Sequence, residues 1–76
     1  LSLNIEQTLI FSKQKKKLHN NQIRYLDEAV RNILQNPKIG EQKQGDLDCI
    51  RVYKFKMAAQ EYLLAYQILE NGILLH

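Results

Sequence analysis

A chain of 76 residues has room for one domain with one small hydrophobic core, and a partner chain would add stability. Its single cysteine excludes an internal disulfide and suits a reducing cytoplasm, while one cysteine and two distant histidines match no zinc motif, so we expect neither metal nor cofactor. The sequence has no signal-peptide pattern and no apolar run near the roughly 20 residues that span a membrane, and its net charge of +3 is modest.

The chain begins with a pattern that predicts a short strand and then a helix. Residues 3–8 alternate apolar and polar side chains, which is typical of a half-buried strand. Residues 9–19 contain neither Gly nor Pro and are rich in Lys and Gln, which favours a helix. Phe11 and Leu18 are seven residues apart and would share one side of that helix.

A second helix is the clearest element of the sequence. Asn20 and Asn21 favour a turn, and either side chain can cap a helix that follows. Asn36 and Pro37 end it, because the residue before proline is excluded from the helical region of backbone space. The two helices therefore form a helical hairpin. The apolar residues that recur at helical spacing in the second helix are Ile23, Leu26, Val30, Ile33 and Leu34.

The second half of the chain predicts three antiparallel strands. Its apolar segments are rich in β-branched and aromatic residues, and the Asn71-Gly72 pair is a strong hairpin signal. The predicted strands are residues 47–57, 62–69 and 73–76, preceded by a polar loop at 38–45 and joined by turns at 58–60 and 70–72.

These elements predict an α+β fold with a short N-terminal strand, a helical hairpin and an antiparallel β-meander packed on the two helices. Along residues 47–57 the alternation is ambiguous, because Ile50 and Val52 fall on the face of the lysines, and a β-bulge near Tyr53 would resolve it. Cys49 is expected to be a small buried side chain. The even-numbered face of the next strand should contact the helices through Tyr62, Leu64, Tyr66 and Ile68.

Several short patterns occur in a set order along the chain. They are Phe11, Lys13, Lys17 and Leu18 in the first helix, Asn36-Pro37 with Gly40 after the second, Gly45-Asp46-Leu47 followed by Ile50-Arg51-Val52-Tyr53-Lys54, and Tyr62-Leu63-Leu64-Ala65-Tyr66-Gln67. In this order they resemble the RelE/ParE superfamily of bacterial toxins from type II toxin–antitoxin systems. The resemblance covers essentially the whole chain, so residues 1–76 are expected to form one toxin domain whose C-terminal end lies beyond His76.

The resemblance implies a toxin that a cognate antitoxin protein neutralises. RelE-like members cut mRNA in the ribosomal A site, whereas ParE-like members poison DNA gyrase and are not nucleases. The leading expectation is an mRNA interferase, an endoribonuclease that needs the ribosome and inhibits translation. The alternatives are a gyrase inhibitor and an inactive toxin that only binds antitoxin. The basic character of the first helix and of residues 51–56 agrees with binding to a polyanion such as RNA.

For RNA cleavage, basic residues and a tyrosine would activate the 2′-hydroxyl, stabilise the phosphate charge and protonate the leaving oxygen. The resemblance assigns Arg51 to a basic position of the family, and Tyr53 and Lys54 complete the candidate catalytic set. RelE-like members carry Arg where this chain has Leu63, and that departure weakens the nuclease hypothesis. The structural alternative for Arg51 is a strand residue that faces solvent.

Two further groups are candidate binding residues. Lys13, Lys16, Lys17 and Lys56 are candidates for contact with RNA or the ribosome, with a solvated helix face and a strand-edge guard against aggregation as their structural alternatives. The apolar residues Leu63, Phe55 and Met57 are expected to be exposed and to contact the antitoxin, whose segments fold on binding.

Overall fold

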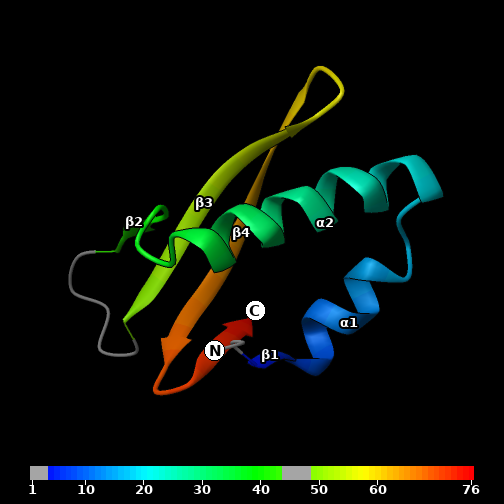
Figure 1. Cartoon of the computed structure of the whole chain (residues 1–76). Coiled ribbons are helices and arrows are strands. Elements are labelled where there is room, and N and C mark those ends of the chain that lie inside the picture. Colours follow the sequence, from blue (N-terminus) through cyan, green and yellow to red (C-terminus); the bar gives the residue numbers. More distant parts are fainter. Residues whose placement is uncertain (1–3, 44–48) are drawn as a thin grey trace.

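The computed structural model describes residues 4–43 and 49–76, and within these ranges two helices cover one face of a five-stranded sheet (Figure 1). This arrangement confirms the predicted α+β class. The elements are β1 (Asn4–Gln7), α1 (Leu9–Lys15), α2 (Asn20–Gln35), β2 (Glu41–Gln42), β3 (Ile50–Met57), β4 (Gln60–Leu69) and β5 (Gly72–Leu75).

The helix boundaries follow local hydrogen bonding. At the start of α1, the Thr8 hydroxyl oxygen accepts a hydrogen bond of 3.1 Å from the Phe11 N–H. The helix ends at Lys15, four residues earlier than predicted, and turns lead into α2. The N-cap of α2 is His19 and not an asparagine, and the Gln22 side chain accepts from the His19 N–H at 2.9 Å. As predicted, α2 stops just before Asn36 and Pro37.

The sheet has the order β1-β5-β4-β3-β2. The antiparallel pairing of β3 with β4 and of β4 with β5 confirms the meander. The N-terminal strand was predicted without a partner, and β1 pairs parallel with β5, with Ile5 opposite Ile73. The short strand β2, which lies in the predicted polar loop, pairs antiparallel with the start of β3. The start of the strand predicted at 47–57 lies partly outside the described residues.

The register of β3 corrects the predicted β-bulge. Pairing with β4 runs without interruption from Ile50 opposite Gln67 to Met57 opposite Gln60. Because side chains alternate between the faces of a strand, Arg51 and Tyr53 share the face of the helices, and Lys54 lies on the opposite face. The buried side chains of β4 hold this register, because a slip by one residue would move them to solvent.

The core lies between the helices and one face of the sheet. On the predicted contact face of β4, Leu64 and Tyr66 are buried and Tyr62 packs at the edge of the core. Ile68 was expected to be covered but is 39% exposed, close to the turn that ends β4. Cys49 is exposed, which contradicts its predicted burial. The buried hydrophobic residues are Phe11, Leu26, Ala29, Ile33, Met57, Leu64, Tyr66, Ile73 and Leu75.

Gly72 allows β1 to approach the C-terminal hairpin. A Cβ atom at this position would lie 2.2 Å from the Asn4 carbonyl oxygen, a distance that no side chain tolerates. The predicted Asn71-Gly72 turn therefore has a second role, because its glycine also permits the parallel pairing of β1 with β5.

The turn between β3 and β4 contains a strained alanine. Ala58 has a φ of 56°, which an L-residue with a Cβ atom adopts at a cost of about 1–2 kcal/mol. We expect Ala58→Gly to raise the free energy of unfolding by about 1 kcal/mol, because glycine accepts this backbone conformation freely. Urea denaturation of the two proteins measures the difference. Equal or lower stability of the variant would contradict a left-handed backbone at this turn.

Candidate binding surface on the helix-free face of the sheet

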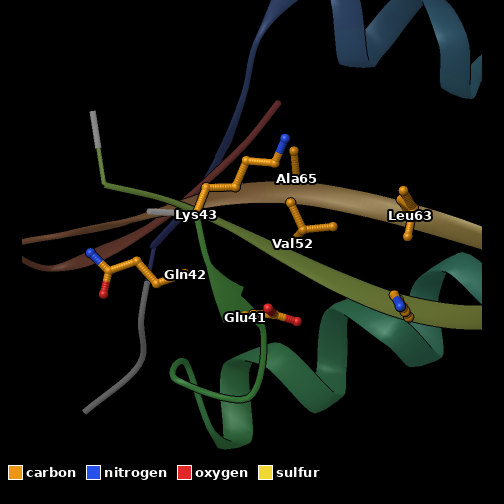
Figure 2. Close-up of a pocket in the computed structure, with 7 residues that line it drawn as sticks. Glu41, Gln42, Lys43, Val52, Leu63 and Ala65 are labelled. Atoms are coloured by element: carbon orange, nitrogen blue, oxygen red, sulfur yellow. The ribbon is translucent and has the colours of Figure 1, made fainter. Parts of the chain in front are cut away.

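The face of the sheet opposite the helices forms a shallow hollow of about 900 Å³, which we call the open face. Figure 2 shows Val52 and Ala65 side by side on the sheet, Leu63 further along it, and Lys43 extending over the sheet towards Ala65. The lining residues come from β2 and the residue after it, from β3 and from β4. They are Glu41, Gln42, Lys43, Val52, Lys54, Leu63 and Ala65.

The open face combines an apolar floor with charges of both signs. Leu63 is 64% exposed and lies opposite Lys54 in the β3–β4 pairing. Lys56 lies opposite Glu61 in the same pairing. Both side chains are exposed and point to the same face of the sheet as Lys54 and Leu63. Positive charge from the lysines is thus offset in part by Glu41 and Glu61, so this face is not uniformly basic.

Arg51 lies on the other side of β3 and holds the loop that follows α2. Its Nη1 atom donates to the Gly40 carbonyl oxygen at 2.8 Å and to the Lys38 carbonyl oxygen at 3.3 Å. Backbone oxygens therefore already occupy one guanidinium nitrogen of the residue that the resemblance made a candidate for catalysis.

Tyr66 holds the same loop from the core. Its ring is fully buried, and its hydroxyl group donates to the Pro37 carbonyl oxygen and accepts from the Gly40 N–H at 2.9 Å. Gly40 has to be glycine in this arrangement, because a Cβ atom there would lie 2.7 Å from the tyrosine ring. The loop from Pro37 to Gly40 is thus tied to β4 by Tyr66 and to β3 by Arg51.

Tyr53 also faces the helices. Its hydroxyl oxygen accepts a hydrogen bond of 3.2 Å from the Asn32 side-chain amide on α2. Its ring stacks on Phe55, with centroids 6.2 Å apart, and Phe55 in turn contacts the Tyr62 ring. The three candidate catalytic residues therefore divide between the two faces of β3, with Arg51 and Tyr53 on one and Lys54 on the other.

The candidate RNA-binding lysines also divide between two surfaces. Lys13, Lys16 and Lys17 are exposed on and just after α1, whose Phe11 packs into the core on the helix side of the sheet. Lys56 is exposed on the open face. The first group lies near the carboxyl end of α1, where positive charge also interacts favourably with the helix dipole.

The candidate partner-binding residues do come together. Phe55, Met57 and Leu63 all line a groove of about 210 Å³ between α1 and the β3–β4 hairpin, together with Phe11 and Leu18. The predicted exposure is confirmed for Leu63, which projects to solvent. It is wrong for Met57, which is 6% exposed, and for Phe55, which is half-buried. We call this hollow the apolar groove.

Two kinds of feature are absent from residues 4–43 and 49–76. No three residues of the His, Cys, Asp or Glu type gather there in a way that would hold a metal ion. None of the helices described is long and apolar enough to cross a membrane.

The sequence did not predict the contacts that Tyr66 and Arg51 make with the loop. It also did not predict that β2 and the residue after it form a rim of the open face, at Glu41, Gln42 and Lys43. A signal for the first was present, because Pro37 and Gly40 punctuate the loop and a buried tyrosine normally finds a partner for its hydroxyl group. No signal marked β2, since Glu41 and Gln42 have little strand propensity.

Residues 5–76 match the family model described as the ParE-like toxin of type II bacterial toxin–antitoxin systems. The chain belongs to this family. Membership implies an antitoxin protein as its partner. The fold is similar to that of an E. coli RelE toxin mutant solved in the free state, with a TM-score of 0.77, 18% sequence identity and coverage of 99% of this chain and 79% of that chain. No curated protein matches the chain in sequence.

Proposed function

We propose that this ParE-like toxin inhibits DNA gyrase by binding it through the open face, and that it does not act by cleaving RNA. The observation that carries the proposal is the division of Arg51, Tyr53 and Lys54 between the two sides of β3. The matching family model describes ParE-like toxins, and the resemblance to ParE-like members suggests gyrase as the target.

The geometry counts against RNA cleavage by the candidate residues. Catalytic acid, base and phosphate-stabilising groups have to lie within hydrogen-bond reach of one scissile phosphate. Arg51 donates to backbone oxygens and Tyr53 bonds to Asn32, both under the helical layer, while Lys54 faces the other way. To bring the three together, β3 would have to leave its register with β4.

The composition of the open face favours a protein as target. RNA-binding surfaces are dominated by positive charge, because neutralising phosphates releases counterions. Here Glu41 and Glu61 lie among the lysines, and Val52, Leu63 and Ala65 supply an apolar floor. An apolar centre with a charged rim is the usual composition of a protein–protein interface.

Ribosome-dependent mRNA cleavage is the second candidate. Two observations favour it, namely the gathering of Lys43 and Lys54 in one hollow with Lys56 beside them, and the similarity of the fold to RelE. The lysines could stabilise a phosphate, but none of the residues that line the hollow is a histidine or a tyrosine. The nearby His76, whose N–H donates to the Ala65 carbonyl oxygen, has its Nε2 atom 3.4 Å from the Gln67 side-chain oxygen.

The apolar groove is our proposed antitoxin site. Phe55, Met57 and Leu63 line it together with Leu18, and Lys15, the last residue of α1, also lines it. An amphipathic antitoxin helix with acidic residues beside its apolar stripe would complement this groove. Target and antitoxin would then occupy neighbouring surfaces that share Leu63.

Two assays with the same purified chain test the proposed function. We expect concentration-dependent inhibition of DNA supercoiling by gyrase, and no cleavage of a defined mRNA on purified ribosomes. Unchanged supercoiling at a large excess of toxin, with cut mRNA in the ribosomal A site, would replace the gyrase proposal by the second candidate. A chain that is inert in both assays but binds antitoxin would support the inactive alternative.

A further inference from the structure

We propose that Arg51 and Tyr66 are positioning residues that hold Lys43 on the open face by fixing the loop before β2. This inference rests on the proposed function only in taking the open face as the surface that contacts the target. Neither side chain reaches that face, so each would act through the loop.

Two side chains of the sheet anchor the loop that precedes β2. The Tyr66 hydroxyl bonds to the Pro37 carbonyl and the Gly40 N–H, and Arg51 donates to the carbonyls of Lys38 and Gly40. Gly40 is thus held through both its N–H and its C=O groups. Both anchors lie on the paired strands β3 and β4, so the loop takes its position from the sheet.

The anchored loop leads directly into Glu41, Gln42 and Lys43, which form the rim of the open face. Gly40 is followed directly by β2, which pairs with β3 only at Glu41 opposite Val52 and Gln42 opposite Arg51. The Lys43 N–H then donates to the Ile50 carbonyl at 3.1 Å. A pairing this short does not hold itself in place, so the anchored glycine determines where the rim begins.

Replacing Arg51 by lysine separates this positioning role from a direct contact with a phosphate. The arginine Nη1 atom is held at the end of a rigid, planar guanidinium group, whereas the lysine nitrogen carries the same charge one bond closer to the backbone on a flexible stem. Both bonds to Lys38 and Gly40 come from one nitrogen, Nη1, so they depend on how far the arginine side chain reaches. Arg51→Lys therefore keeps the charge but weakens the anchor. A positioning role predicts that this variant loses potency, whereas a direct contact with a phosphate predicts that it keeps it.

Hydrogen–deuterium exchange on the purified 76-residue chain tests the anchor without any target. We expect Arg51→Ala to speed amide exchange at Gly40 and Lys43 at least ten-fold, with exchange in β4 and β5 unchanged. Arg51→Lys should show most of the same effect, and Arg31→Ala, an exposed arginine on α2, should show none. Exchange at the wild-type rate in Arg51→Ala would overturn the proposal.

Growth arrest after expression at matched protein levels supplies the functional readout, and it does not presume which target is hit. We expect Arg51→Ala and Arg51→Lys each to need at least five-fold more protein for equal arrest. In a Lys43→Ala background the further loss from Arg51→Ala should fall below two-fold, because the rim residue is already gone. Full potency of Arg51→Lys, or an undiminished loss in the Lys43→Ala background, would overturn the positioning role.

The failure of this inference is distinguishable from a failure of the proposed function. If the wild-type chain leaves gyrase unaffected, the proposed target is wrong, while exchange at Gly40 and Lys43 still decides whether the anchor exists. If Arg51→Ala does not fold, as judged by its circular dichroism melt, Arg51→Gln takes its place in both experiments.

Discussion

Tyr66→Phe is expected to lower the free energy of unfolding by about 2–4 kcal/mol, although it removes a single oxygen atom. The substitution leaves the buried N–H of Gly40 and the carbonyl of Pro37 without their shared partner, and each unsatisfied buried group costs roughly 1–3 kcal/mol. A chain of this size has a total stability on the order of 4–11 kcal/mol, so the loss is a large part of it. Urea denaturation followed by circular dichroism measures the change.

Tyr62→Phe is the matched control on the same strand. Tyr62 lies at the edge of the core and packs against Phe55, so we expect a loss below about 1 kcal/mol. If the two variants were equally stable, the Tyr66 hydroxyl would not hold the loop, and the account of how the rim of the open face is built would lose its basis.

The double variant Lys43→Glu with Lys54→Glu is expected to weaken gyrase inhibition at least ten-fold. Both side chains line the open face, and reversing their charges places like charges against a surface that accepts lysines. A ten-fold loss corresponds to about 1.4 kcal/mol of binding free energy. The supercoiling assay gives the concentration for half inhibition, and thermal melts should show that the fold is retained, because surface substitutions of this kind change stability little.

The matched control reverses the same amount of charge on α1, with Lys13→Glu and Lys16→Glu. These lysines are exposed on the helix side of the sheet, so supercoiling inhibition should stay within about two-fold of the wild type. Their substitution is instead expected to weaken antitoxin binding. A control that lost inhibition as strongly as the double variant on the open face would mean that general charge, and not this surface, governs the target interaction.

Much of the fold followed from local patterns. The second helix was predicted because its apolar residues recur at helical spacing over four turns and Asn36-Pro37 stops it. The meander was predicted because apolar strands alternate with turns, and Asn71-Gly72 is a specific hairpin signal. Helical spacing, a helix stop and a hairpin turn each depend on residues that are close in sequence, so they can be recognised without the fold.

The candidate site was harder to predict, because it depends on which way the residues of β3 face. The sequence placed Ile50 and Val52 with the lysines, and only pairing with Leu64 and Tyr66 across the sheet decides that Arg51 and Tyr53 lie under the helices. Register is a long-range property that no local pattern in this strand determines. The parallel pairing of β1 is long-range in the same sense, since it joins the two ends of the described chain.

Amine-reactive labelling of the lysines, with and without gyrase, tests most directly the claim that the open face contacts the target. Mass spectrometry of the labelled chain reads every lysine in one sample. We predict that gyrase protects Lys43 and Lys54 strongly and leaves Lys13 and Lys16 as reactive as in the free toxin. Protection confined to the α1 lysines, with Lys43 and Lys54 still fully labelled in the complex, would contradict the account.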